Sequence, residues 1–141
     1  MTTLAGLGWG SEFHIDDALD VLTEISEVTS LKPPMHTADT VEATHMKSPS
    51  KFREYIAGLL DGGEADVTMN LVPGSASDIL CRAAVGATRD YKIVIPTTGG
   101  TWEATGQVIV TGYDRETPID DRMTATLNVK FTGAATEAAG A

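Results

Sequence analysis

Two segments of this chain alternate between apolar and polar residues with a period of two, and no other feature of the sequence constrains the fold as strongly. In residues 64–72 the apolar side chains are Ala65, Val67, Met69 and Leu71. In residues 123–131 they are Met123, Ala125, Leu127, Val129 and Phe131. Successive side chains of a strand point to opposite faces, so this period predicts antiparallel strands with one buried and one wetted face.

Weaker signals predict four further strands, over residues 22–31, 39–45, 91–95 and 102–113. In the first of them, Thr, Ile and Val residues favour extended structure until Pro33 and Pro34 end it. The mostly antiparallel connections predict a mainly β fold, an antiparallel β-sandwich or barrel with one flanking α-helix.

That helix is predicted over residues 75–87, with Ser75 as its cap and Asp78 in the first turn, where an acidic residue is favourable. Apolar residues recur along it at helical spacing, and we expect them to pack against a sheet. They are Ala76, Ile79, Leu80, Ala83, Ala84 and Ala87.

A length of 141 residues predicts a single domain, residues 1–141. Within it we expect residues 1–15 to form an N-terminal arm and residues 134–141 a flexible C-terminal tail. Residues 46–63 are expected to form a long charged loop with exposed hydrophobic residues. Loops of this length are uncommon inside compact domains unless they serve a function.

Composition narrows the classes of partner. The net charge is −10, from 20 acidic and 10 basic residues, and this sign opposes a groove that grips nucleic acid through its phosphates. The single cysteine, Cys81, cannot form an internal disulfide. Residues 1–10 lack the features of a signal peptide, and no apolar run approaches the ~20 residues of a membrane helix, so we expect a protein made and kept in a cytoplasm.

A search for catalytic and metal-binding patterns predicts no enzyme, no cofactor and no metal. Asp39, Glu42 and His45 are three residues apart, a spacing that brings ligands together only on a helix. The glycine-rich residues 58–63 lack the Gly-Lys-Ser/Thr ending of a phosphate-binding loop. The adjacent aspartates of the sequence are poorly placed for acid–base work, and we interpret them as solvated loop charges.

The order of these elements resembles that of the tail tube, or major tail, proteins of long-tailed bacteriophages and of phage-like gene transfer agents. The resemblance covers residues 20–133. It rests first on REYIAGLLDGGE at residues 53–64, followed by a strand and Pro73-Gly74. One helix and YKIVIP at residues 91–96 come next. The last features are WEATG at residues 102–106, PIDD at residues 118–121 and a final strand that ends at Phe131-Thr132-Gly133.

This resemblance implies a structural subunit that forms hexameric rings, which stack into the hollow tube through which DNA is delivered. It implies a place in the tail of a virion or phage-like particle, with assembly in the bacterial host cytoplasm. The implied partners are further copies of the chain, a tip initiator, a terminator and a tape measure inside the tube. DNA is expected to pass through the lumen without specific binding.

Two sets of site residues follow from this hypothesis. The long loop is expected to contact a neighbouring subunit or ring through Lys47, Lys51, Phe52, Arg53, Tyr55 and Ile56. The polar face of the sheet is expected to line the lumen, although the sequence leaves open whether that face lies inside or outside. Its residues are Glu64, Asp66, Thr68, Asn70, Glu103, Thr124, Thr126 and Asn128.

Two other classes of protein fit the same pattern. One is a different assembly protein on a similar fold: a secretion-system tube, a tail terminator or a capsid decoration protein. The other is a monomeric β-sandwich binding module that uses Trp9 or Trp102 to stack on a ligand, although such residues more often serve core or interface packing.

Overall fold

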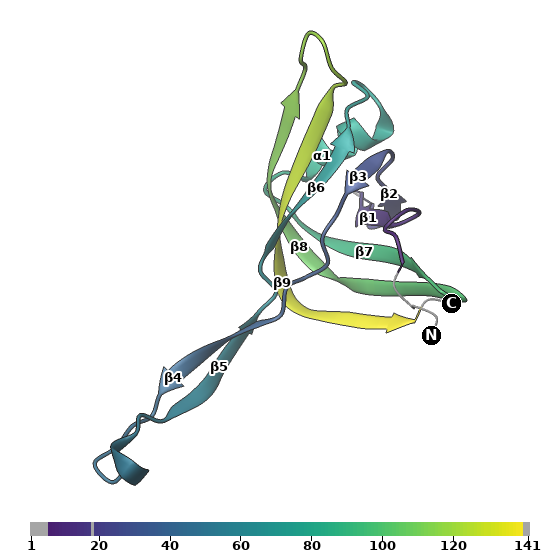
Figure 1. The fold of residues 1–141 in the computed structure, drawn as a ribbon. Coiled ribbons are helices and arrows are strands. Elements are labelled where there is room, and N and C mark those ends of the chain that lie inside the picture. Colours follow the sequence, from purple (N-terminus) through teal and green to yellow (C-terminus); the bar gives the residue numbers. More distant parts are fainter. Residues whose placement is uncertain (1–5, 18, 140–141) are drawn as a thin grey trace.

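A computed structural model describes residues 6–17 and 19–139 (Figure 1). Nine strands, one α-helix and one short 3-10 helix are assigned in this part of the chain. In chain order they are β1 (Glu12–Asp16), β2 (Leu22–Glu24), β3 (Val28–Ser30), β4 (Thr37–Glu42), η1 (Pro49–Lys51), β5 (Tyr55–Asp61), β6 (Glu64–Asn70), α1 (Ala76–Ala84), β7 (Thr88–Thr97), β8 (Gly100–Glu116) and β9 (Thr124–Ala139).

Seven of the strands form one curled antiparallel sheet in the order β2-β1-β7-β8-β9-β6-β3. Its two edge strands, β2 and β3, are consecutive in sequence, so the short link between them brings the edges of the sheet together. In this link the Ile25 N–H donates to the Phe13 carbonyl at 2.9 Å, and the Asn70 N–H donates to the Glu27 carbonyl at 3.0 Å. The prediction of a mainly β, barrel-like fold with one flanking helix is confirmed.

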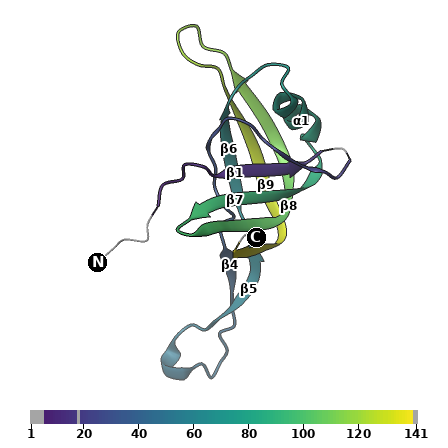
Figure 2. The same cartoon turned by 90° about the vertical axis from the view of Figure 1, so that its right-hand side faces the viewer.

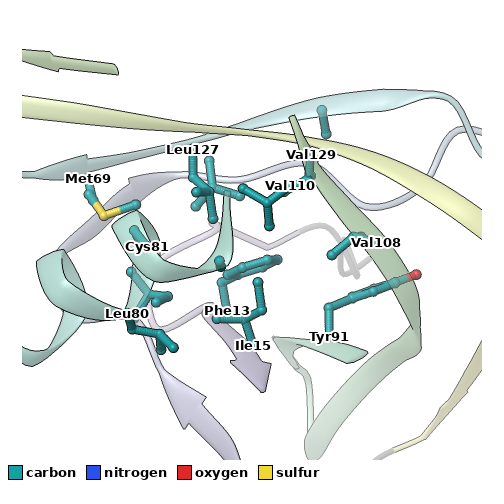
Figure 3. Close-up of a cluster of buried hydrophobic side chains, with 14 of the residues drawn as sticks. Phe13, Ile15, Met69, Leu80, Cys81, Tyr91, Val108, Val110, Leu127 and Val129 are labelled. Atoms are coloured by element: carbon teal, nitrogen blue, oxygen red, sulfur yellow. The ribbon is translucent and has the colours of Figure 1, made fainter. Parts of the chain in front are cut away.

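The hydrophobic core fills the inside of this curl, with α1 against it (Figure 3). The apolar positions of both alternating segments lie in the core, as predicted, with one exception. Met123 precedes β9 and is 37% exposed, because the strand begins only at Thr124. From the helix, Leu80, Cys81 and Ala84 join the core, and burial raises the pKa of the Cys81 thiol to about 12.

The helix is present but shorter than residues 75–87 and turned differently from the prediction. Ser75 caps it by accepting a hydrogen bond from the Asp78 N–H at 3.2 Å. Its buried side includes Ser77 and Asp78, whereas Ile79 of the predicted stripe is exposed. Hydrogen bonds determine this orientation. Ser77 hydrogen-bonds to Ser26, and Asp78 hydrogen-bonds to Tyr113, so the side of the helix that carries Ser77 and Asp78 faces inward.

Two predictions near the N-terminus need correction. The single strand expected over residues 22–31 is two short strands, β2 and β3, because the chain changes from one edge of the curled sheet to the other between them. The N-terminal arm expected over residues 1–15 is wrong for its last residues. Glu12–Asp16 form β1, which lies between β2 and β7 and buries Phe13 and Ile15 in the core.

The long loop expected over residues 46–63 is wrong as well, because Tyr55–Asp61 form strand β5. Strand β5 pairs with β4 in a separate two-stranded sheet, which projects from the curled sheet (Figures 1 and 2). We call residues 37–61 the arm, and residues 43–54 its tip. The strand predicted over residues 39–45 corresponds to β4, which begins and ends earlier.

The flexible tail expected over residues 134–141 is also wrong for its described part. Strand β9 continues to Ala139, and its end pairs with Trp102–Thr105 of β8. The pairing is made by backbone groups, which small residues such as alanine supply as well as large ones do. A register shift lies between Thr105 and Gln107, where Gly133 of β9 adopts a positive φ of 73°.

The root of the arm is fixed against the curled sheet by a close backbone approach. The Met35 N–H donates to the Gly62 carbonyl at 2.9 Å, and the Phe131 N–H donates to the Gly63 carbonyl at 3.0 Å. A Cβ atom on Gly62 would lie 2.8 Å from the Cβ of Phe131, which is closer than real Cβ contacts. Only glycine therefore allows the arm to leave the sheet at this point.

We predict that Gly62→Ala destabilises the fold by about 1–3 kcal/mol, because the added methyl group overpacks the junction with Phe131. Urea unfolding measures the change. The matched control is Gly100→Ala, where an added Cβ meets nothing within 4 Å. Equal stability of the two variants would show that the close approach at the arm root does not constrain the fold.

Candidate assembly surfaces

The polar face of the curled sheet brings together seven of the eight residues predicted to line a lumen. In the register of β6 and β9, Asp66 lies opposite Asn128, Thr68 opposite Thr126, and Asn70 opposite Thr124. Glu64 lies opposite Lys130, which partly offsets its charge. Because paired residues of antiparallel strands share a face, these side chains form one continuous polar surface opposite the core.

The eighth residue, Glu103, lies on the same face but farther along the sheet, on β8. It pairs in register with Val94, and its carboxylate lies 2.6 Å from the Nζ of Lys92. The ion pair offsets the charge of Glu103, so Asp66 is the stronger acidic group of the predicted set.

Further acidic residues, which were not predicted from the sequence, lie on this face. Glu12 and Glu24 lie on either side of His14, and the ligand atoms of these three residues lie within 4.8 Å of one another. Asp16 continues the same side of β1 and lies beside Asp90 of β7; burial, together with this second carboxylate, raises the pKa of Asp16. The alternation of residues 12–16 could have indicated these positions. The prediction instead placed most of this segment in an N-terminal arm, residues 1–15.

The arm is the second candidate surface, and it exposes apolar side chains along its whole length. Every residue of β4 is exposed, and in β5 only Gly58 is partly covered. Phe52, Tyr55, Ile56 and Leu59 are exposed as predicted. Leu59 and Leu60, at 83% and 82%, are the most exposed hydrophobic residues of β5. Exposed hydrophobic surface of this kind is typical of a protein–protein contact.

The tip of the arm is held in shape by its own polar contacts. Glu54 lies at their centre: its carboxylate accepts from the Ser48 hydroxyl at 2.7 Å and lies 3.2 Å from Nε2 of His45. The Glu54 N–H donates to Thr44, whose hydroxyl donates to Glu42. His45 and Glu42 are thus engaged in contacts at the tip, and Asp39 takes no part in them.

Three cations lie on this ordered tip. Arg53 lies 4.0 Å from the carboxylate of Glu42, at the limit of an ion pair. In the part of the chain that the structure describes, Lys47 and Lys51 have no carboxylate oxygen within 4.0 Å. The tip therefore presents positive charge beside the exposed ring of Phe52.

A buried carboxylate ties α1 to the far end of β8. Asp78 accepts a hydrogen bond from the Tyr113 hydroxyl at 2.8 Å and one from the Gly74 N–H at 3.1 Å. Arg115 and Arg82 lie 3.6 and 3.9 Å from its oxygens. Burial alone would raise the pKa of Asp78, but the two hydrogen bonds and the two cations outweigh it and lower this pKa below its usual range.

The two tryptophans, which were candidates for stacking on a ligand, lie in different surroundings. Trp102 packs against the core, whereas Trp9 is exposed beside a groove that also includes Ile95. Among residues 6–17 and 19–139, no helix has both the length and the hydropathy of a membrane span.

Comparison with known proteins shows the family of the chain. Residues 10–138 match the family model described as "Lambda phage tail tube protein, TTP". This match covers nearly all of the chain, which has the curled antiparallel sheet, the one helix and the projecting hairpin described above. The chain belongs to the lambda phage tail tube protein family. No curated protein sequence matches it.

Solved structures with the same fold come from several tube assemblies. The tail of an empty gene transfer agent particle, refined with C6 symmetry, is 18% identical, covers 94% of this chain and 98% of its own, and has a TM-score of 0.75. The SPP1 tail tube is 10% identical, covers 95% of this chain and 79% of its own, and has a TM-score of 0.67. A sheath/tube terminator of an extracellular contractile injection system is 11% identical, covers 98% and 99%, and has a TM-score of 0.70.

We predict that Asp78→Asn lowers the free energy of unfolding at pH 7 by about 1.5–3 kcal/mol, the range for hydrogen bonds to a charged group. Because the pKa of Asp78 is lower in the folded than in the unfolded chain, the carboxylate stabilises the fold above its ordinary pKa of 3.8. That contribution disappears as the pH falls through the folded value.

Urea unfolding between pH 7 and pH 3 tests this prediction. The acid-dependent loss of stability should be smaller in Asp78→Asn than in the parent. The control is Asp114→Asn, an exposed position on β8, which should change stability by less than about 0.5 kcal/mol. An Asp78 variant that is as stable and as acid-sensitive as the parent would contradict the anchoring role.

Proposed function

We propose that this chain, acting as one tail-tube domain over residues 1–141, forms hexameric rings that stack into a hollow tail tube for DNA delivery. The observation that carries the proposal is the family match over residues 10–138. The arm supports it, because an ordered hairpin that exposes apolar side chains on all sides gains stability only by contact with another molecule. The C6 symmetry of the gene transfer agent tail, which has the same fold, supports hexameric rings.

This function is structural and needs no catalysis. The chain contributes a wall and the contacts that hold the wall together. We place it in the tail of a virion or phage-like particle, assembled in the bacterial host cytoplasm on a tip initiator, around a tape measure, and closed by a terminator.

In this proposal the polar face of the sheet lines the lumen. Asp66, Thr68 and Asn70 on β6, with Thr124, Thr126 and Asn128 on β9, would give a hydroxyl- and amide-rich wall with a net acidic character. The wall carries few cations, since Lys130 lies opposite Glu64, and the repulsion between the wall and phosphates is screened beyond roughly 10 Å at physiological salt. DNA would therefore pass without binding.

A tube terminator is the second candidate function, because the terminator of the contractile injection system has the same fold at a TM-score of 0.70. The two functions differ in copy number. A tube subunit occurs in every ring of the shaft, whereas a terminator occupies one end. Quantitative mass spectrometry of purified particles separates them.

We predict that a chain with residues 38–60 replaced by Asn-Gly folds but does not form tubes. The replacement keeps the pairing of Thr37 with Asp61 at the arm root and removes the exposed strands and tip. Circular dichroism and urea unfolding report the fold, and negative-stain microscopy reports tubes. Thr40→Ser, which keeps the arm, is the control, and normal tubes from the shortened chain would refute an assembly role for the arm.

We predict that Asp66→Lys leaves tube assembly intact and slows DNA delivery, because an exposed ammonium group on the wall attracts phosphates. Asp66→Asn is the matched control, since it removes the acidic charge without adding a cation, and it should deliver DNA near the normal rate. Particles from both variants are compared by the fraction of DNA released over time. Equal release from lysine and asparagine tubes would mean that this face is not the wall that DNA meets.

A further inference from the structure

A groove between α1 and the turn from β1 to β2 exposes apolar side chains that nothing in the chain covers within the described residues. Its volume is about 470 Å³, and Leu19, Ala76, Ile79, Leu80 and Ala83 line it. Leu19 is 82% exposed and Ile79 is 52% exposed. Such a cluster differs from single surface hydrophobic residues, which are common and need no partner.

The groove exists because of the way α1 is anchored. Asp78 faces inward to meet Tyr113, and Ser77 faces inward to meet Ser26, so the neighbouring Ile79 turns away from the core. The anchor therefore leaves the apolar side chain of Ile79 available at the surface, where it contributes to the groove instead of to the core.

The rim of the groove carries two carboxylates and one cation, since the Arg89 guanidinium donates a hydrogen bond to the Asp17 carbonyl at 2.6 Å. Asp17 lines it, and Asp20 follows in the same turn. The carboxylate of Asp17 accepts hydrogen bonds from the Leu19 and Val21 N–H groups at 2.8 and 3.1 Å, which hold the turn in place. The groove thus offers an apolar floor beside fixed negative charge.

The tip of the arm has the complementary pattern. Phe52 is 74% exposed and stands between Lys51 and Arg53 in sequence, and the exposed Met46 stands beside Lys47. An aromatic side chain between cations fits an apolar floor beside carboxylates both in polarity and in charge. The internal contacts of the tip mean that little of its conformational freedom remains to be lost on docking.

The two surfaces lie far apart on the molecule, although the loop between β8 and β9, and not α1, forms the end opposite the arm (Figures 1 and 2). In both views α1 lies away from the end where the arm projects (Figures 1 and 2). When copies are related by translation along an axis, a contact between two different surfaces does not close on itself. Such a contact generates an open-ended row of copies.

Resting on the tube function proposed above, we infer that the groove between α1 and the β1–β2 turn receives the arm tip of a second copy of this chain in the adjacent ring. Phe52 enters the groove against Ile79 and Leu80. Lys51 and Arg53 lie beside Asp17 and Asp20. The anchor at Asp78 then sets the orientation of the receiving surface as well as the packing of the helix.

Cysteine cross-linking in tubes isolated from cells that produce the particles tests this contact. The variant carries Phe52→Cys and Ile79→Cys; the native Cys81 is fully buried and does not compete. Because a disulfide needs Cα atoms within about 7 Å, oxidation links copies only where the tip lies in the groove. We expect a ladder of linked chains that continues past six subunits on a non-reducing gel, since the links run along the tube.

The matched control pairs Phe52→Cys with Val85→Cys, at a position of similar exposure (45%) at the end of the same helix but outside the groove. It should give no ladder. Tubes of the first variant that form without cross-links, or a ladder that ends at six, would overturn the inference and leave the tube function intact. Absence of the unmodified chain from the tail shaft would refute the tube function, and this contact with it.

A second pair of variants covers the case in which the cysteines themselves block assembly. Ile79→Asn removes the apolar floor, and Val85→Asn makes the same change outside it. We expect the yield of tubes to fall about tenfold for Ile79→Asn and to stay within about twofold of the parent for Val85→Asn. Equal yields from the two variants would contradict docking in the groove.

Discussion

The pairing of β8 with a neighbour on each side is the interaction on which the rest of the structure depends. This strand runs from Gly100 to Glu116 and pairs with β7 along its first part and with β9 along nearly all of its length. Through β7 it positions β1, and through β9 it positions β6 and the root of the arm at Phe131. Through Tyr113 it holds Asp78 and so the helix. Each candidate surface is therefore placed relative to this one strand.

A curled sheet of this kind has two faces with different physical needs. The apolar side chains of the inner face are buried within the chain, because α1 and the link between β2 and β3 cover them. The outer polar face needs water, and the arm can bury its apolar residues only against another molecule. In the described residues the curled sheet thus has a complete core, whereas the arm and the groove beside α1 are left uncovered, as expected for a subunit of a larger assembly.

The parts of the fold that the sequence predicted are those whose local pattern agrees with the tertiary structure. Residues 64–72 and 123–131 alternate because one side of each strand meets the core, and the period revealed the polar face as well. The single helix was predicted from its cap and spacing. The family resemblance, which rested on the order of elements over residues 20–133, is confirmed by the match over residues 10–138.

The parts of the fold that were not predicted are those stabilised by residues far away in the sequence. Strand β5 contains YIAGLLD, which has no period of two because neither of its faces is buried in the chain. The end of β9 is rich in alanine, and only the backbone of β8 holds it. The face that α1 presents was predicted from apolar residues alone, whereas the hydrogen bonds of Asp78 and Ser77 determine it. These contacts join residues far apart in sequence, so no local pattern reports them.

Cryo-electron microscopy of the tail shaft, from the particles that contain this chain, is the most direct test of the central claim. The account predicts rings of six copies stacked along the shaft, with the β6–β9 polar face and Asp66 toward the lumen and each arm extended onto the next ring. A shaft without this chain would contradict the claim, as would rings in which the arm contacts only its own subunit.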